Sequence, residues 1–209
     1  MIKLQELLEL REMVYTNEIP KKHKKRFTRK TPHFGDFPIT YKDFPENDSK
    51  VTLNEIKLLS KIEPSPMLVK EYDEVEDTFK KALEVTDFNA DTKYIDDIVH
   101  ESVKYIMELK YKYNRPRPYQ IAAFYGIDLN GTELDSMKTP SYPSGHAVQG
   151  YLVADILSQQ DPENEVIYQA VGEDIAHSRI IGKAHYPSDK EYGRVIATEL
   201  FIGLKWYQR

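Results

Sequence analysis

The sequence predicts an all-α protein, folded as a single-domain helical bundle. Apolar residues recur at helical spacing along most of the chain, whereas the alternating pattern of β-strands is scarce and no internal repeat occurs. The chain has 209 residues, of which 40% are hydrophobic and 30% charged, enough for one domain with a sizeable core. It contains no cysteine, which excludes disulfides and thiolate metal sites.

The first half of the chain is expected to contain several helices and one irregular stretch. A short amphipathic helix is predicted where Thr52 and Glu55 are spaced as a capping box. Helices are expected over 4–15, 52–62, 66–85 and 91–114, and residues 15–50, rich in proline, lysine and polar side chains, are predicted to be irregular. We therefore divide the chain into residues 1–50, an appendage made of an N-terminal helix and a basic irregular segment, and a helical domain over 51–209.

The second half begins where the two prolines of the stretch 115–118 end a helix, because proline cannot continue one. A mixed connection follows, with a turn at Asn130-Gly131. The pair Ser188 and Glu191 is spaced as a capping box before the last helix. The connection spans 120–142, and the three helices after it are expected over about 145–160, 164–180 and 189–206.

Charge is spread unevenly along the sequence. The net charge is −5, but residues 21–30, KKHKKRFTRK, hold seven of the 29 basic residues and no acidic one. Such a run is either a solvated connector or a surface for nucleic acid or another anionic partner. No nucleic-acid motif or aromatic stacking pattern accompanies it, so we interpret it as a connector and keep the interaction as the alternative.

The N-terminal residues and the lengths of the apolar runs bear on the location of the protein. Lys3, Glu6, Glu9 and Arg11 interrupt the N-terminal apolar residues, so no signal peptide is predicted there. No apolar run reaches the length of a membrane span. We expect a cytoplasmic protein without a membrane span, or an exported one if a leader has been removed. A homo-oligomer is compatible with the sequence.

The stretch SYPSGHAVQG, residues 141–150, is the first candidate for a binding site. Ser144 is a natural N-cap, so Gly145 and His146 fall in the first turn of the helix that follows. A helix start has unpaired backbone N–H groups and the positive end of the dipole, and glycine lets a ligand approach them closely. The stretch predicts an anion site beside a titratable group. The alternative is that Ser144 only caps the helix and His146 is a surface histidine.

Further charged residues fall where the predicted helices end. Lys110 lies on the apolar stripe of its helix, where an ammonium is costly without a partner charge. Arg117 follows at the proline break, and Arg179, His185 and Asp189 surround the junction of the last two helices. Cations beside histidines favour a tetrahedral oxyanion such as phosphate, bound at helix ends. Asp189 is close enough to accept a hydrogen bond from one ring nitrogen of His185, which would make the other a better base or nucleophile.

Two other interpretations of these residues are open. Each residue taken alone has a structural explanation, such as a surface arginine or a carboxylate favoured by a helix dipole. A metal site formed by His146, His185 and Asp189 is the second. However, no closely spaced histidine pair occurs, and the neighbouring cations would repel a dication. We therefore expect no metal.

The order of three motifs adds a resemblance to a known family. Residues 110–118 contain K-x6-R-P, residues 143–146 are P-S-G-H, and the stretch 178–189 contains S-R-x5-H-x3-D. This order resembles the signature of the type 2 phosphatidic acid phosphatase and vanadium haloperoxidase superfamily. The chain looks most like the soluble bacterial class A nonspecific acid phosphatases, which implies that residues 51–209 are an acid-phosphatase-like domain.

Two departures limit what carries over from that family. Residues 1–60 resemble nothing in it. Its class A enzymes are usually exported, whereas no signal peptide is predicted here. Its membrane lipid phosphatases need several spans, which this sequence lacks, and its haloperoxidases are much longer.

The resemblance implies a metal-independent phosphoric monoester hydrolase that acts through a phosphohistidine. His185, oriented by Asp189, would attack phosphorus, and His146 would protonate the leaving oxygen and then activate water. The phosphate oxygens would be held by Lys110, Arg117, Arg179 and the backbone N–H groups of Ser144 and Gly145. The implied substrate is a small phosphate ester. No cofactor is expected, and vanadate is expected as an inhibitor or phosphate mimic.

Two other functions remain as alternatives. The first is a vanadate-dependent haloperoxidase-like enzyme, which would show peroxidase activity after loading with vanadate. The second is a non-catalytic phosphate-fold protein that binds a partner or nucleic acid through residues 21–30. Salt-sensitive binding without turnover would distinguish it.

Overall fold

A computed structural model describes residues 4–35 and 39–207 of the chain. Lys3, one of the charges that argue against a leader, lies outside these ranges, as do the other residues of 1–3, 36–38 and 208–209. The described residues form helices and loops without a strand, which confirms the all-α class. In chain order the elements are α1 Leu4–Glu12, α2 Lys21–Phe27, α3 Lys50–Lys61, α4 Pro66–Glu71, α5 Val75–Thr86, α6 Thr92–Tyr113, α7 Pro118–Phe124, the short 3-10 helix η1 Asp135–Lys138, α8 Gly145–Gln160, the 3-10 helix η2 Pro162–Asn164, α9 Glu165–Ile181 and α10 Pro187–Tyr207.

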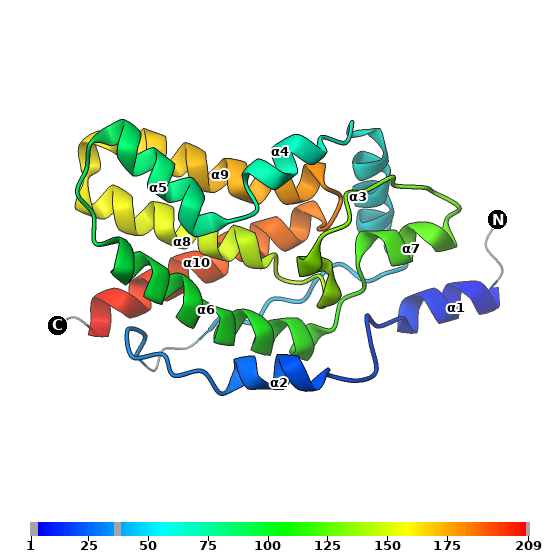
Figure 1. The fold of residues 1–209 in the computed structure, drawn as a ribbon. Helices are drawn as coiled ribbons and strands as arrows, with labels where there is room; N and C mark the ends of the chain where they lie inside the picture. The colour runs from blue at the N-terminus through cyan, green and yellow to red at the C-terminus, as the bar shows by residue number, and fades with distance from the viewer. Residues whose placement is uncertain (1–3, 36–38, 208–209) are drawn as a thin grey trace.

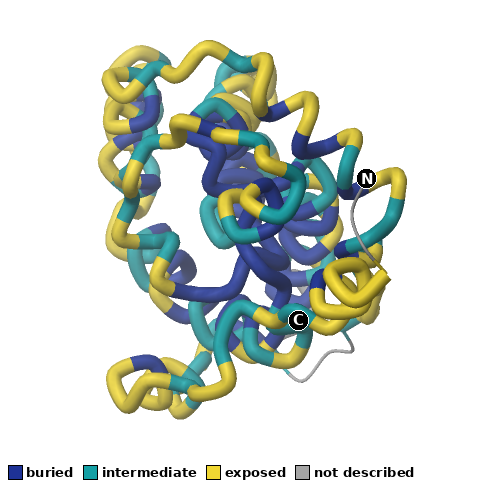
Figure 2. Tube along the Cα trace, turned by 90° about the vertical axis from the view of Figure 1, so that its right-hand side faces the viewer, coloured by how far each residue is buried: buried dark blue, intermediate teal, exposed yellow. Residues whose placement is uncertain are grey.

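The centre of the bundle is α8, which packs against α9 and α10 (Figure 1). α8 and α9 approach closely because each has a glycine at the contact: a Cβ on Gly172 would lie 3.0 Å from the carbonyl oxygen of Gly150. α5 and α6 complete the two main apolar clusters. The buried residues concentrate in the middle of the molecule (Figure 2). None of the helices over residues 4–35 and 39–207 combines the length and hydropathy that crossing a membrane requires.

The N-terminal segment, predicted as an appendage, contributes side chains to the apolar clusters. Leu10 is fully buried in a cluster with residues of α3 and α7. Phe34 is buried in the cluster formed mainly by α6, α8 and α10. The division of the chain at residue 50 stays a prediction, but the described residues before it are packed on the bundle.

The prediction that residues 15–50 are irregular is wrong over Lys21–Phe27, which form α2. This helix lies along α6 (Figure 1). His23 is buried with its Nδ1 2.6 Å from the hydroxyl oxygen of Tyr111, and the ring of Phe27 meets the same tyrosine edge-on. The basic run shows little apolar periodicity of its own, so contacts with α6 stabilise the helix.

The single helix predicted over 66–85 is two helices, α4 and α5. A continuous helix would pair the carbonyl of Val69 with the amide of Asp73. Instead, that carbonyl accepts a hydrogen bond from Nη2 of Arg179 at 2.7 Å. A contact with α9 therefore accompanies the break, which no proline or glycine marks in the sequence.

Both predicted capping boxes are wrong. Ser49 caps α3 by accepting a hydrogen bond from the amide of Thr52 at 3.1 Å, so Thr52 is not the N-cap. Ser188 lies within the first turn of α10, and its amide donates to Oε1 of Glu55 at 2.7 Å. Glu55 thus makes a long-range contact with the start of α10, which replaces the local boxes predicted for Thr52 and for Ser188 with Glu191.

Candidate functional site

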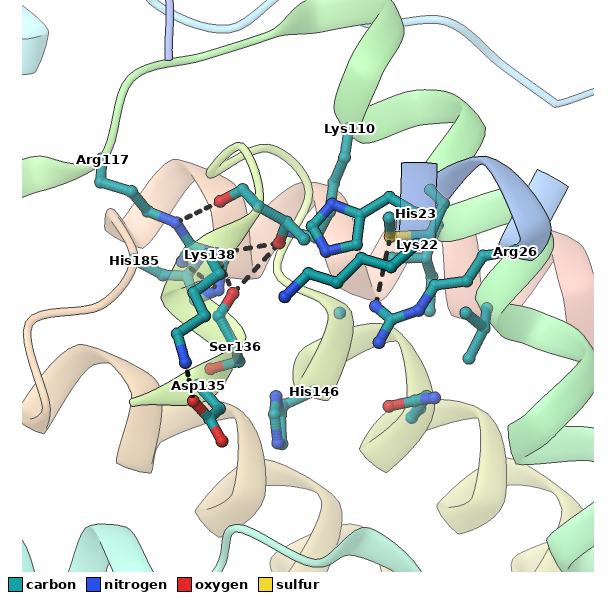
Figure 3. Close-up of a pocket in the computed structure, with 16 residues that line it drawn as sticks. Lys22, His23, Arg26, Lys110, Arg117, Asp135, Ser136, Lys138, His146 and His185 are labelled. Carbon is teal, nitrogen blue, oxygen red and sulfur yellow. Dashed lines mark hydrogen bonds and ion pairs between the residues drawn. The ribbon is translucent and has the colours of Figure 1, made fainter. Parts of the chain in front are cut away.

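A cavity of about 400 Å³ lies where α2, α6, η1 and the N-terminus of α8 meet (Figure 3). It brings together five of the predicted site residues, which lie far apart in the sequence: Lys110, Arg117, Gly145, His146 and His185. Among the described residues that line it, Ser144, Arg179 and Asp189 are absent. Asp189 contacts His185, Arg179 shares Asp73 with His146, and Ser144 directly precedes Gly145.

Two of the predicted phosphate-binding cations are buried at one end of the cavity. Lys110, in the last turn of α6, is 4% exposed, and its Nζ donates to the carbonyl oxygens of Pro140 at 2.7 Å and Ser141 at 3.3 Å. Burial, together with the charge of Arg117, holds the pKa of Lys110 well below its usual value. Burial lowers the pKa of Arg117 to about 10, so its guanidinium stays charged at neutral pH. Lys110 thus lies on the buried side of α6, as its position on the apolar stripe indicated.

The hydrogen bonds around His185 assign its tautomer. Its Nε2 lies 2.9 Å from Nη1 of Arg117, and its Nδ1 lies 3.1 Å from Oδ2 of Asp189. A guanidinium can only donate, so Nε2 accepts and carries the lone pair, while Nδ1 carries the proton and donates to the carboxylate. Burial and the charge of Arg117 lower the pKa of His185 well below its usual value. His185 is therefore a neutral imidazole with a basic nitrogen facing the cavity.

Asp189 is held as a carboxylate by a buried network that the motifs did not reveal. Burial alone would raise its pKa, but Nη1 of Arg115 lies 2.6 Å from Oδ1 and keeps the pKa of Asp189 well below its usual value. The hydroxyl of Ser141 also donates to this carboxylate. Behind it, Nη2 of Arg115 lies 3.2 Å from Oε2 of Glu55, and the guanidinium stacks over the ring of Tyr186 at 3.8 Å. These contacts fix the acceptor that orients His185.

The N-terminus of α8 has the predicted cap but offers fewer free amides than expected. Ser144 is the N-cap, and its Oγ accepts from the amide of Ala147 at 3.4 Å. Its own amide donates to the carbonyl oxygen of Asp189 at 3.1 Å, so the predicted use of this N–H for phosphate is not supported by the structure. Gly145 begins the helix and has no intrahelical acceptor for its amide. A Cβ on Gly145 would lie 3.9 Å from Cε of Lys110, so this amide and the lysine are neighbours.

His146 and Arg179 meet at Asp73, in the break between α4 and α5. Nε2 of His146 lies 3.0 Å from the carbonyl oxygen of Asp73 and 3.5 Å from its Oδ1. Since a carbonyl only accepts, Nε2 of His146 carries a proton. Nη1 of Arg179 lies 2.5 Å from the same carboxylate, and hydrogen bonds from His146 and Arg179 lower the pKa of Asp73 to about 2. Burial lowers the pKa of His146, although Asp73 opposes the shift.

In the described part of the chain, no three histidine or acidic side chains are grouped closely enough to hold a metal ion. Arg117, the cation nearest to the predicted ligand His185, is already hydrogen-bonded to it. The observed arrangement thus places cations around the neutral imidazole of His185, which suits an anion.

A family model described as the PAP2 superfamily matches residues 98–209, more than half of the chain. The chain belongs to the PAP2 superfamily. This confirms the family that the three motifs indicated.

Two curated relatives of this PAP2 chain are non-specific acid phosphatases. It is 38% identical over 91 residues to a non-specific acid phosphatase of Providencia stuartii, which covers 43% of this chain and 36% of the relative. It is 38% identical over 68 residues to a non-specific acid phosphatase of Salmonella typhimurium, which covers 32% of this chain and 27% of the relative. The aligned part thus spans about a third of the length of these relatives.

Several residues of this PAP2 site escaped the sequence reasoning. Asp73 lay in a stretch predicted to be helical throughout. Arg115 precedes the motif arginine by two residues, and its position in the proline break was a usable signal. Glu55 was assigned to a local cap. Lys22 and Arg26 belonged to a run interpreted as a connector, yet both line the cavity.

Proposed function

We propose that this PAP2 chain hydrolyses phosphate monoesters through a phosphohistidine at His185, without a metal ion. One observation carries the proposal: His185 is a buried, neutral imidazole whose Nδ1–H is held by Asp189 and whose Nε2 lone pair lies at a cationic cavity. This is the arrangement that an imidazole nucleophile requires. The similarity to non-specific acid phosphatases supports the same reaction class.

In the first step, Nε2 of His185 forms a bond to phosphorus while the bond from phosphorus to the ester oxygen breaks. The leaving oxygen takes the Nε2 proton of His146, which acts in its imidazolium form and is left as a neutral imidazole. In the second step, His146 accepts a proton from water as the water oxygen attacks phosphorus. The N–P bond breaks, and inorganic phosphate and neutral His185 are regenerated.

Binding of substrate must replace two hydrogen bonds that the structure shows within the protein. Nη1 of Arg117 donates to the lone pair of His185, so a phosphate oxygen has to draw this N–H away before attack. Arg179 is paired with Asp73, so it reaches the phosphate only by sharing or releasing that carboxylate. Lys110, Arg117 and the amide of Gly145 would then neutralise the charge on the transferred group.

The proposal is tested by trapping the intermediate. The enzyme is mixed with 4-nitrophenyl phosphate in EDTA and quenched in alkali, and the peptides are analysed by mass spectrometry. We expect phosphate release that is unaffected by the chelator and an acid-labile phosphate on His185, with His185→Ala inactive. Activity lost in EDTA and restored by magnesium or zinc, or phosphate on another residue, would overturn the mechanism.

A further inference from the structure

The basic helix α2 lies outside the residues matched by the family, yet it forms one wall of the cavity. His23 and Phe27 are one helical turn apart and both contact Tyr111 of α6, which fixes how α2 is turned. Lys22 and Arg26 form the neighbouring pair one turn apart, and both line the cavity (Figure 3). The orientation of this pair is therefore determined by packing.

The cations of α2 make no ion pair among the described residues, although the charge of Lys22 helps to lower the pKa of Asp135. Neither Lys22 nor Arg26 makes an ion pair there, and Arg26 makes a weak hydrogen bond from its Nη1 to Sδ of Met107 at 3.9 Å. Like charges one turn apart destabilise a helix, and an anion held between them would offset that cost.

The cations of the cavity fall into an inner and an outer group. The inner group, Lys110 and Arg117, is buried beside His185. The outer group consists of Lys22, Arg26 and Lys138, and Figure 3 shows Lys22 and Lys138 pointing into the space beside His146. Lys138 is paired with Asp135, the one carboxylate among the described residues of the lining. A single phosphate uses the inner group and leaves Lys22 and Arg26 without an ion-pair partner.

The wall that α6 contributes between Arg26 and Lys110 is apolar. Arg26 touches Met107, which precedes Lys110 by one turn of α6, about 5 Å along the helix axis. Val103 and Ile106 line the same wall. A ligand that reaches both groups must therefore pass over aliphatic side chains, which suits a short carbon skeleton rather than a direct P–O–P linkage.

We propose that the outer group binds a second phosphate, carried on the leaving group, so that the preferred substrates are bisphosphates of a short carbon skeleton. This inference rests on the proposed function, because His146 marks the leaving-group side only if it is the acid. The second phosphate is bound but not cleaved. Its contribution is to affinity and is screened by salt, since the outer cations are exposed.

The test compares butane-1,4-diol bisphosphate with the monophosphate of the same diol and with methyl diphosphate. The variant is Lys22→Gln/Arg26→Gln, and the matched control is Lys21→Gln/Lys25→Gln, which removes the same charge at the same spacing from residues that are not in the lining. We expect KM for the bisphosphate to be about tenfold lower than for the monophosphate, as two partly screened charged contacts allow. The variant should lose this advantage with unchanged kcat, and the control should keep it.

Calorimetry with butane-1,4-bisphosphonate and butylphosphonate gives a readout that needs no turnover. If the esters are not hydrolysed but the bisphosphonate binds about tenfold more tightly in the wild type only, the proposed function fails and the anion site stands. The second phosphate site is wrong if the wild type binds both phosphonates with equal affinity. It is also wrong if Lys21→Gln/Lys25→Gln loses the preference for the bisphosphonate as fully as Lys22→Gln/Arg26→Gln does. A preference for methyl diphosphate overturns the carbon skeleton. Tighter, salt-sensitive binding of a single-stranded oligonucleotide that depends on Lys22 and Arg26 overturns the small-molecule ligand in favour of nucleic acid.

Discussion

Nη1 of Arg179 lies 2.5 Å from Oδ1 of Asp73. The arginine that was predicted to bind phosphate is therefore paired with a carboxylate of the protein itself. The same carboxylate lies 3.5 Å from Nε2 of His146. Asp73 thus stands where two groups of the proposed mechanism meet, and it competes with substrate for one of them.

Asp73→Asn should bind inorganic phosphate more tightly. Removing the negative charge frees Arg179. Loss of this half-exposed ion pair should raise the affinity for phosphate about fivefold. The measurement is the inhibition constant of phosphate. Asp174→Asn is the matched control. It removes the same charge from a residue that contacts Tyr72, next to Asp73. Weaker phosphate binding in Asp73→Asn would show instead that Asp73 mainly positions the arginine.

Arg115→Met should destabilise the fold strongly. The change leaves Glu55 and Asp189 buried without their cation, which costs about 3–5 kcal/mol of the free energy of unfolding. Urea denaturation measures it. Arg11→Met is the control, since its pair with Glu46 is exposed and contributes less than about 1 kcal/mol. A loss in Arg115→Met no larger than in the control would mean that the network is not a structural support.

The two histidines should respond differently to the leaving group. His185→Ala should be inactive on every ester, because the covalent intermediate cannot form. His146→Ala should lose about 10² to 10⁴-fold on an alkyl phosphate, whose leaving oxygen needs a proton. It should lose far less on 4-nitrophenyl phosphate, whose leaving group departs without one. Burst kinetics with both esters measure the difference, and equal losses on the two would show that the roles are wrongly assigned.

The value of kcat/KM on an alkyl phosphate should fall as the pH rises through a value below 6.5. Burial lowers the pKa of His146 from 6.5, and only its protonated form can act as the acid, so activity is lost on the alkaline side of that pKa. The pKa of His185 is lowered much further, so it stays unprotonated over the same range. Because the phosphate of the substrate also titrates near pH 6, the pH profile is compared with that of His146→Ala on the same ester. Identical profiles would contradict the assignment.

Vanadate should inhibit competitively and more strongly than phosphate. Its trigonal-bipyramidal adduct with Nε2 of His185 would resemble the transition state of phosphoryl transfer. Inhibition constants for both anions on the wild type test this, and Arg179→Lys should weaken vanadate more than phosphate, because lysine lacks the bidentate geometry. Vanadate that binds no better than phosphate would argue against a histidine nucleophile.

The sequence predicted the parts of the site that lie at helix ends, because those residues have local signals. Ser144 was recognisable as a cap, and Lys110 as a charge on an apolar stripe. Asp73 was not, since the helix break that positions it depends on Arg179, more than a hundred residues later. Glu55 was misassigned for the same reason: its spacing fits a local box, but Arg115 and Ser188 are stronger partners.

The ion pair between Glu55 and Arg115 also bears on whether the residues matched by the family can be transferred to another protein as a unit. Glu55 and Asp73 precede residue 98, where the family match begins, and each holds an arginine that lies within the match. The part of the chain recognisable by similarity is therefore not a self-contained unit. A chimaera that transplants residues 98–209 alone would carry the motifs but leave Arg115 and Arg179 without these acids, and the two halves have to be exchanged together.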